Sequence, residues 1–140
     1  MNGRFSTGPL LLAAAALIFP AITTGCGSDQ PSGEYVARVG ELRLVACDTT
    51  VPGRVEGAFG PDRLAWLEAQ LADDTATIVA MHHPPILVGM PAMDALGLPE
   101  ADRAALAELL ARAPQVKRVV SGHVHRATTG ESGGRPVFVC

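Results

Sequence analysis

The residues with the clearest capacity for chemistry are the histidines. The chain has four, and all of them fall in two short motifs, His82-His83-Pro84-Pro85 and Gly122-His123-Val124-His125. Neutral imidazole is the side chain most often used to bind zinc and other transition metals. A single His-x-His can be an ordinary surface pair, and a single His-Pro can simply end a strand. The two motifs together predict a metal site.

Both motifs directly follow segments that we expect to be buried strands, residues 75–81 and 116–120. In α/β sheets, ligands gather outside the carboxyl ends of the strands, so the two motifs are expected to meet at one edge of the sheet. Pro84 and Pro85 cannot continue a hydrogen-bonded ladder and therefore fix the point where the first strand ends.

The spacing of the second motif suggests how it could bind metal. In an extended segment, His123 and His125 would point to the same side, about 6–7 Å apart. Two metal ions about 3.5–4 Å apart could then each accept one of these imidazoles. Val124 would point away and pack, and Gly122 would let the backbone turn close to the metals.

The elements needed to position these residues follow an α/β pattern. Gly40-Glu41 joins two predicted strands in a hairpin, Pro61 and Asp62 open a helix, and Pro114 ends another. Residues 48–60 and 86–99, rich in glycine and proline, are expected to be irregular loops. The expected strands are 35–39, 42–47, 75–81, 116–120 and 136–139, and the expected helices begin near 61 and span 100–113.

Composition limits the classes of function. The chain has 140 residues, enough for one domain at most, and 48% of them are hydrophobic, so a buried core is expected. The formal net charge of −3 argues against a nucleic-acid-binding surface. Cys26, Cys47 and Cys140 have no metal-type spacing, and Cys47 lies in an apolar run typical of a small buried side chain.

Residues 1–33 form an apolar segment and a loop that can be interpreted in two ways. Arg4, an apolar run over 9–22 and the sequence up to Cys26 resemble a bacterial secretory signal with a lipoprotein-type cleavage site. The same run, shorter than the about 20 residues that span a membrane, also fits a helix packed on a core. We expect a cytoplasmic protein; the alternative is an exported lipoprotein anchored in a membrane through Cys26.

About 100 residues resemble the calcineurin-like metallophosphoesterases, and within them the class III cyclic-nucleotide phosphodiesterases and related glycerophosphodiesterases. The two histidine motifs, occurring in this order, are the most specific part of the resemblance. The matching pieces are Leu42-Arg43-Leu44-Val45-Ala46-Cys47-Asp48-Thr49, Val51-Pro52-Gly53, Leu64-Ala65-Trp66-Leu67, Met81-His82-His83-Pro84-Pro85, Met93-Asp94 and Gly122-His123-Val124-His125-Arg126.

The resemblance implies roles for these residues and two divalent metal ions, manganese, iron or zinc. His82 and His123 would bind the second metal and His125 the first. His83 would support the ligands or face the substrate rather than bind a metal directly. The loop around Met93-Asp94 would cap the pocket and shape substrate choice. The substrate would be a small phosphodiester, with a 3',5'-cyclic nucleotide as one candidate.

The other half of the family's site is missing from the sequence. The family supplies Asp-x-His, Gly-Asp-x-x-Asp and Gly-Asn-His motifs upstream, and the chain has none of them: its only asparagine is Asn2. Three neutral imidazoles do not offset the charge of two divalent ions, so the two-metal centre is incomplete here, and the histidines could hold one ion at most. No residue is assigned as catalytic.

The expected fold is therefore the C-terminal half of a metallophosphoesterase-type β-sandwich flanked by helices, truncated at both ends, over residues 34–140. Two functions follow. One is a phosphodiesterase whose histidine half is present here. The alternative is a catalytically inactive fragment, or an interaction module that buries its exposed sheet edge against a partner.

Overall fold

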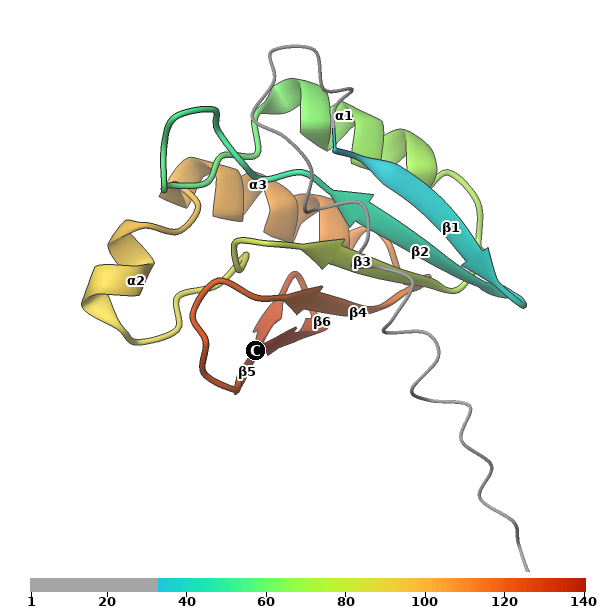
Figure 1. Cartoon of the computed structure of the whole chain (residues 1–140). Helices are drawn as coiled ribbons and strands as arrows, with labels where there is room; N and C mark the ends of the chain where they lie inside the picture. The colour runs from blue at the N-terminus through green and yellow to red at the C-terminus, as the bar shows by residue number, and fades with distance from the viewer. Residues whose placement is uncertain (1–32) are drawn as a thin grey trace, which may run out of the picture. The chain divides into compact units, whose positions relative to one another are not determined.

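The computed structural model describes residues 33–140, whose six strands form one mixed sheet in the order β1-β2-β3-β4-β6-β5 (Figure 1). The four central strands β2, β3, β4 and β6 run parallel to one another, while β1 and β5 pair antiparallel with them at the two edges. The elements are β1 (Tyr35–Val39), β2 (Leu42–Cys47), α1 (Pro61–Gln70), β3 (Thr77–Met81), α2 (Pro91–Ala95), α3 (Glu100–Ala111), β4 (Val116–Ser121), β5 (Thr128–Ser132) and β6 (Arg135–Val139).

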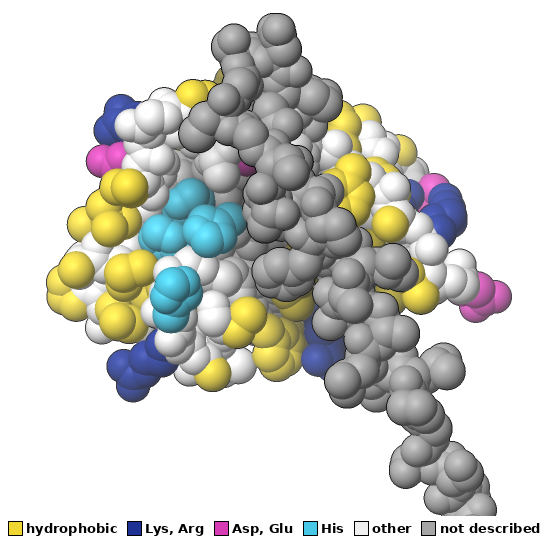
Figure 2. Space-filling model, in the orientation of Figure 1, with side chains coloured by type: hydrophobic (Ala, Val, Ile, Leu, Met, Phe, Trp, Pro, Cys, Tyr) yellow, Lys and Arg dark blue, Asp and Glu magenta, His cyan; other side chains and the backbone are white. Residues whose placement is uncertain are grey.

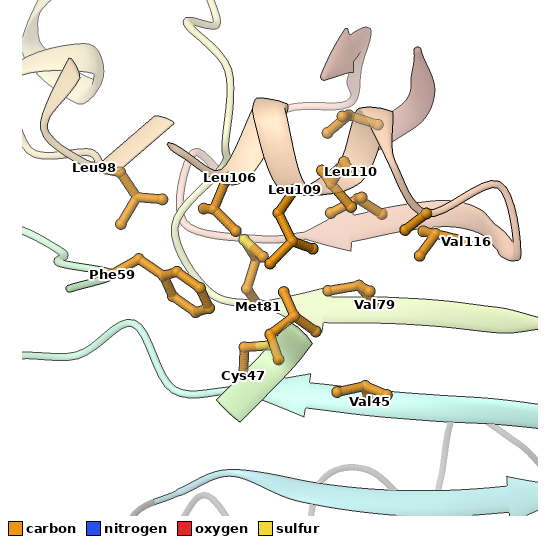
Figure 3. Packing of buried hydrophobic residues seen from close by; sticks show 14 of the residues in the cluster. Val45, Cys47, Phe59, Val79, Met81, Leu98, Leu106, Leu109, Leu110 and Val116 are labelled. Carbon is orange, nitrogen blue, oxygen red and sulfur yellow. The ribbon is translucent and has the colours of Figure 1, made fainter. Parts of the chain in front are cut away.

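The core lies on the face of the sheet that α1 and α3 cover. Alternate residues of the central strands, among them Val45, Val79 and Val119, are fully buried there, as the period of two in a strand requires. Leu106 and Leu110 of α3, also fully buried, pack onto these strands from above (Figure 3). This cluster holds the parallel strands together and therefore fixes the edge at which their carboxyl ends meet.

The sequence predicted most of these elements. The hairpin at Gly40-Glu41 is confirmed, and so is α1 starting at Pro61, while β3 is two residues shorter than expected. Cys47 is buried as expected; burial, reinforced by the negative charge of Glu34, raises the pKa of its thiol to about 12. The α/β prediction is therefore confirmed for the described residues.

Two elements were missed. Residues 86–99, predicted to be an irregular loop, contain the short helix α2, which begins at Pro91. β5 was not predicted at all; it forms a hairpin with β6 through Gly133 and Gly134, both at positive φ, as tight hairpins require. Both elements are short and depend on neighbours rather than on a strong local pattern.

All strands of residues 33–140 belong to one sheet, so the second sheet of a complete sandwich is not among them. The predicted N-terminal apolar segment also lies outside the described residues. The two interpretations of this segment, a lipoprotein signal ending at Cys26 or a helix packed on a core, therefore stay predictions. Within the described range, no helix is long and apolar enough to cross a membrane.

Candidate metal centre

The two histidine motifs meet where β3 and β4 end side by side. The strands are parallel, with Met81 beside Ser121 in register, so the residues that follow them leave the sheet at the same edge. The backbone N–H of Gly122 donates to the carbonyl of His82 at 3.1 Å and ties the two turns together. Histidine side chains gather in one area of the surface as a result (Figure 2).

His82 and His123 form the centre of this group. Nε2 of His82 lies 3.2 Å from Nδ1 of His123, although the residues are 41 positions apart in sequence. Two nitrogens bound to one tetrahedral zinc at 2.0–2.1 Å would lie about 3.3 Å apart. Nε2 of His123 is buried with no hydrogen-bond partner among the described residues. The 3.2 Å separation fits a pair of side chains arranged to share a metal ion, with Nδ1 as the metal-facing nitrogen of His123.

The electrostatics of the pair also suit a metal. Desolvation lowers the pKa of His82, and the neighbouring charges of His83 and His125 lower it further. Desolvation is likewise the main cause of the lowered pKa of His123, followed by repulsion from the other three histidines. A lowered pKa keeps both imidazoles neutral near pH 7, and the neutral form is the one that binds metal.

His83 also lies in this group, since one of its ring nitrogens comes within 4.8 Å of a ring nitrogen of His82 and of one of His123. It is nevertheless engaged elsewhere. Nε2 faces the carbonyl of Val55 at 3.2 Å, and because a carbonyl only accepts, this nitrogen must donate. Nδ1 pairs with the hydroxyl of Thr49 at 2.8 Å. Whether the ring is neutral or protonated, it has no free lone pair for a metal unless one of these bonds breaks.

His125 does not join the group of three whose ring nitrogens lie within 4.8 Å of one another. The expectation of an extended His-x-His segment is wrong. His123 has φ 74° and His125 has φ 52°, both in the left-handed region, so the segment turns rather than runs straight. Val124 is buried as predicted. His125 stays near enough to repel charge on His82 and His123, but it is exposed.

The role of Gly122 beside the metals stays a prediction. Gly122 is not at positive φ, and an added Cβ would make ordinary contacts, 3.7 Å from the carbonyl oxygen of Cys140 and 3.9 Å from Nδ1 of His82. The close approach occurs at Gly57, where a Cβ would lie 2.5 Å from Cγ and Nδ1 of His83. Gly57 therefore lets the loop before α1 lie directly on the His83 ring.

The loop around Met93-Asp94 lies beside the site. The carboxylate of Asp94 accepts from the backbone N–H of Val88 at 2.7 Å, which folds the loop back on itself. Met93 packs against the core, and with Ile86 and Val124 it lines a small crevice. Asp94 thus shapes the loop, and its assignment to substrate choice stays a prediction.

Thr49, Val55 and Gly57 are site residues that the sequence did not reveal. The Asp48-Thr49 pair follows the buried strand β2, which ends at the same edge as β3. The rule that located the histidines, polar residues directly after a parallel strand, could have found Thr49. The hydrogen bond from His83 to the backbone carbonyl of Val55 could not be predicted from the sequence, because every residue has such a carbonyl.

No family model matches the sequence, but known proteins resemble it. It is 38% identical over 107 residues to a probable cyclic nucleotide phosphodiesterase of Synechococcus sp. (76% of this chain, 41% of the relative). It is 36% identical over 104 residues to a glycerophosphodiester phosphodiesterase of Enterobacter lignolyticus (73% and 37%), and 36% identical over 110 residues to a cAMP/cGMP dual specificity phosphodiesterase of Mycobacterium tuberculosis (76% and 33%). The chain therefore spans about two fifths or less of these relatives.

Solved structures share the fold. Purple acid phosphatase from yellow lupin superposes with a TM-score of 0.60 at 17% identity, over 81% of this chain and 23% of that one. The GAP50 protein of Plasmodium gives 0.53 at 18% identity, over 79% and 38%. Together with the sequence relatives, this fold shows that residues 33–140 are part of a calcineurin-like metallophosphoesterase domain.

Proposed function

We propose that this protein takes part in metal-dependent hydrolysis of small phosphodiesters, with cyclic nucleotides and glycerophosphodiesters as the candidate substrates. One observation carries the proposal: the ring nitrogens of His82 and His123, 3.2 Å apart and both kept neutral, in a chain whose relatives are named as phosphodiesterases. The proposed metal is a divalent ion, manganese, iron or zinc. When bound, such an ion polarises a phosphoryl oxygen and makes bound water acidic enough to act as a nucleophile.

In this proposal, the chain's own residues hold the ion and receive the substrate. His82 and His123 are the ligands from the two turns, and His125, the third proposed ligand, would approach from the exposed side. His83 holds its neighbours in place, because both of its ring nitrogens are already hydrogen-bonded. A full two-metal centre needs carboxylates in addition, which offset the charge of two close cations.

The negative charge of a phosphodiester would meet Arg126, which directly follows His125. The Arg126 side chain is exposed and forms no ion pair with another residue of the described range. With Gly89, Met90 and Thr128 it lines a hollow between the loop that follows β3 and the loop that follows β4. A guanidinium suits a phosphate because it offers several donors in one plane. We therefore assign this hollow to the substrate.

A second function is supported by the absence of acidic residues from the candidate metal group of the described range. Within residues 33–140, the group that could hold a metal consists of histidines alone, with no carboxylate among them. A non-catalytic module that binds one metal ion would have this donor set. It differs from the first proposal in predicting metal binding without turnover.

The experiment measures both properties on the full 140-residue chain. Metal affinity is obtained by competition with a chromogenic chelator, and hydrolysis of bis(4-nitrophenyl) phosphate is followed with added manganese. Turnover that is lost in His82→Ala and His123→Ala, but kept in Lys117→Ala on the exposed start of β4, supports a phosphodiesterase. Metal binding with no turnover means that this chain by itself acts as the non-catalytic module. A folded chain that binds no metal contradicts both.

For location, we propose the cytoplasm, because the apolar run is compatible with a helix over 10–19 that ends at Pro20. The alternative is an exported lipoprotein anchored through Cys26. Cell fractionation of the wild type beside Cys26→Ser separates the two. A wild-type protein in the membrane fraction, released by the substitution, would contradict the cytoplasmic proposal.

A further inference from the structure

The loop between β2 and α1 is closed on itself and encloses the His83 ring. The backbone N–H of Ala58 donates to the carbonyl of Thr49 at 3.0 Å, so the two ends of residues 49–58 meet. Compact loops of this kind are usually filled by their own side chains. Here, the loop is filled from outside, by His83, whose ring nitrogens face Thr49 and Val55.

The loop is also tied to the helices that cover the core. The N–H of Phe59 donates to the carboxylate of Asp102 in α3 at 2.6 Å, and Phe59 itself is 1% exposed. The guanidinium of Arg63 in α1 donates to the carbonyls of Ala58 and Thr50 at 2.9 and 3.0 Å. The loop is therefore a firm support, and the ring it holds is fixed relative to the core.

Thr49 makes the closest polar contacts to that ring. Its side chain is fully buried, and its hydroxyl bonds twice to the same histidine: it accepts from the backbone N–H of His83 at 3.1 Å and pairs with Nδ1 at 2.8 Å. When the ring is neutral, Nε2 carries the proton that it donates to Val55, so the hydroxyl must donate to Nδ1. These contacts select one tautomer and one ring orientation.

The fixed ring lies against both members of the metal pair. The centroid of the His83 ring is 4.8 Å from that of His82, at an interplanar angle of 88°, and 4.5 Å from that of His123. A rotation of His83 would push against either neighbour, whereas its present position leaves their nitrogens 3.2 Å apart. The orientation of His83 therefore limits the positions open to both neighbouring rings.

We propose that Thr49 is a positioning residue for the metal site: through its two hydrogen bonds to His83, it sets the orientation of His82 and His123. Thr49 itself touches neither metal nor substrate. The inference rests on the proposed function for the claim that His82 and His123 hold a metal, but the His83 tautomer that it requires is a property of the metal-free chain.

The first test is the tautomer. The ¹⁵N signals of the histidine rings are recorded for the full chain, free of metal and above the ordinary pKa of histidine. The result expected for His83 is a protonated Nε2 and an unprotonated Nδ1. A protonated Nδ1 with an unprotonated Nε2, or a mixture of both forms in the wild type, would overturn the proposal.

The second test compares variants. Thr49→Val keeps the shape of the side chain and removes both hydrogen bonds; we expect the His83 tautomers to mix and the affinity for zinc or manganese to fall about 10–100-fold, the usual effect of losing a residue that orients ligands. Thr49→Ser should keep affinity and tautomer. The matched control is Thr50→Val, because the neighbouring exposed hydroxyl bonds only to the Asp48 carboxylate, at 2.7 Å.

A folded Thr49→Val chain with wild-type metal affinity would disprove the positioning role. An equal loss in Thr49→Ser would also count against it, since the hydroxyl is kept. If Thr49→Val does not fold, the tautomer of His83 in the wild type and the metal affinity of Thr49→Ser still test the positioning role of Thr49. A wild type that binds no metal but shows the expected tautomer would contradict the proposed function and leave the Thr49–His83 arrangement in place.

Discussion

The two histidine turns follow adjacent parallel strands but are built differently. After β3, His83 is 3% exposed and fully hydrogen-bonded, and Pro84 and Pro85 are buried behind it. After β4, His123 and His125 adopt left-handed backbone angles that cost non-glycine residues about 1–2 kcal/mol each, and Nε2 of His123 lacks a partner among the described residues. The first turn is held by hydrogen bonds and burial, whereas the second keeps a strained backbone and one ring nitrogen that has no partner in the described range.

This difference suggests a division of work. Backbone strain at functional sites persists where the surrounding structure enforces it, and here it is confined to one of the two turns. In the proposed site, the β3 turn would be the fixed part, because Thr49 and Val55 of the loop after β2 hold His83. The β4 turn would be the strained part.

The largest expected effect comes from removing the ligand in either turn. His82→Ala and His123→Ala should each lower the affinity for zinc or manganese by more than about 100-fold, beyond the 10–100-fold range of supporting residues. The measurement is competition with a chromogenic chelator, with Lys117→Ala as the control. If only the His123 variant lost affinity, the site would belong to the β4 turn alone.

The support of the β3 turn can be broken from the loop. In Gly57→Ala, the new Cβ would lie 2.5 Å from the His83 ring, so the loop or the ring must move. We expect the free energy of unfolding to fall by about 1–3 kcal/mol, as in other overpacked sites, and metal affinity to fall with it. The matched control is Gly60→Ala, since a Cβ at Gly60 meets nothing within 4 Å. Equal denaturant midpoints for both variants would contradict the packing argument.

The strain in the β4 turn can be measured by exchanging alanine for glycine in the presence of a chelator. His125→Gly should be about 1 kcal/mol more stable than His125→Ala, because glycine adopts positive φ without a steric cost. His82 is not at positive φ, so His82→Gly should be about 0.5–1 kcal/mol less stable than His82→Ala. Urea unfolding of the four variants gives both differences. The same order at both positions would remove the contrast between the turns.

The smallest effect is expected from pH. The pKa values of His82 and His123 are lowered from 6.5 in the folded chain, so the unfolded chain binds more protons as the pH falls through 6.5 toward the lowered values. The metal-free protein should therefore lose stability on acidification over this window. The double variant His82→Ala/His123→Ala should lose less. Identical pH profiles in urea unfolding would show that the pair does not contribute.

The sequence predicted the regular part of the fold because that part depends on local patterns. The apolar runs of β2 and β3, the proline at the start of α1 and the leucines of α3 are all visible along the chain. The strand β5 was not predicted, because only Ser132 at its end is buried and the strand depends on pairing with β6. α2 escaped because it has five residues, none of them buried.

The candidate site divides in the same way. Residue types and their position after parallel strands sufficed to select four histidines and to bring His82 close to His123. They did not predict the left-handed turn at His123 and His125, where Val124 is buried between two residues at positive φ, because non-glycine residues rarely adopt such angles.

What the sequence determined by itself is the chemistry available: four imidazoles, and a resemblance to metallophosphoesterases that the relatives and the fold confirm. What only the tertiary structure decided is why His82 and His83 differ. They are neighbours of the same type, and the family resemblance separated their roles without giving a physical reason. The loop from β2 provides that reason, because a hydroxyl and a carbonyl brought from more than twenty residues away engage both nitrogens of His83 and leave His82 facing His123.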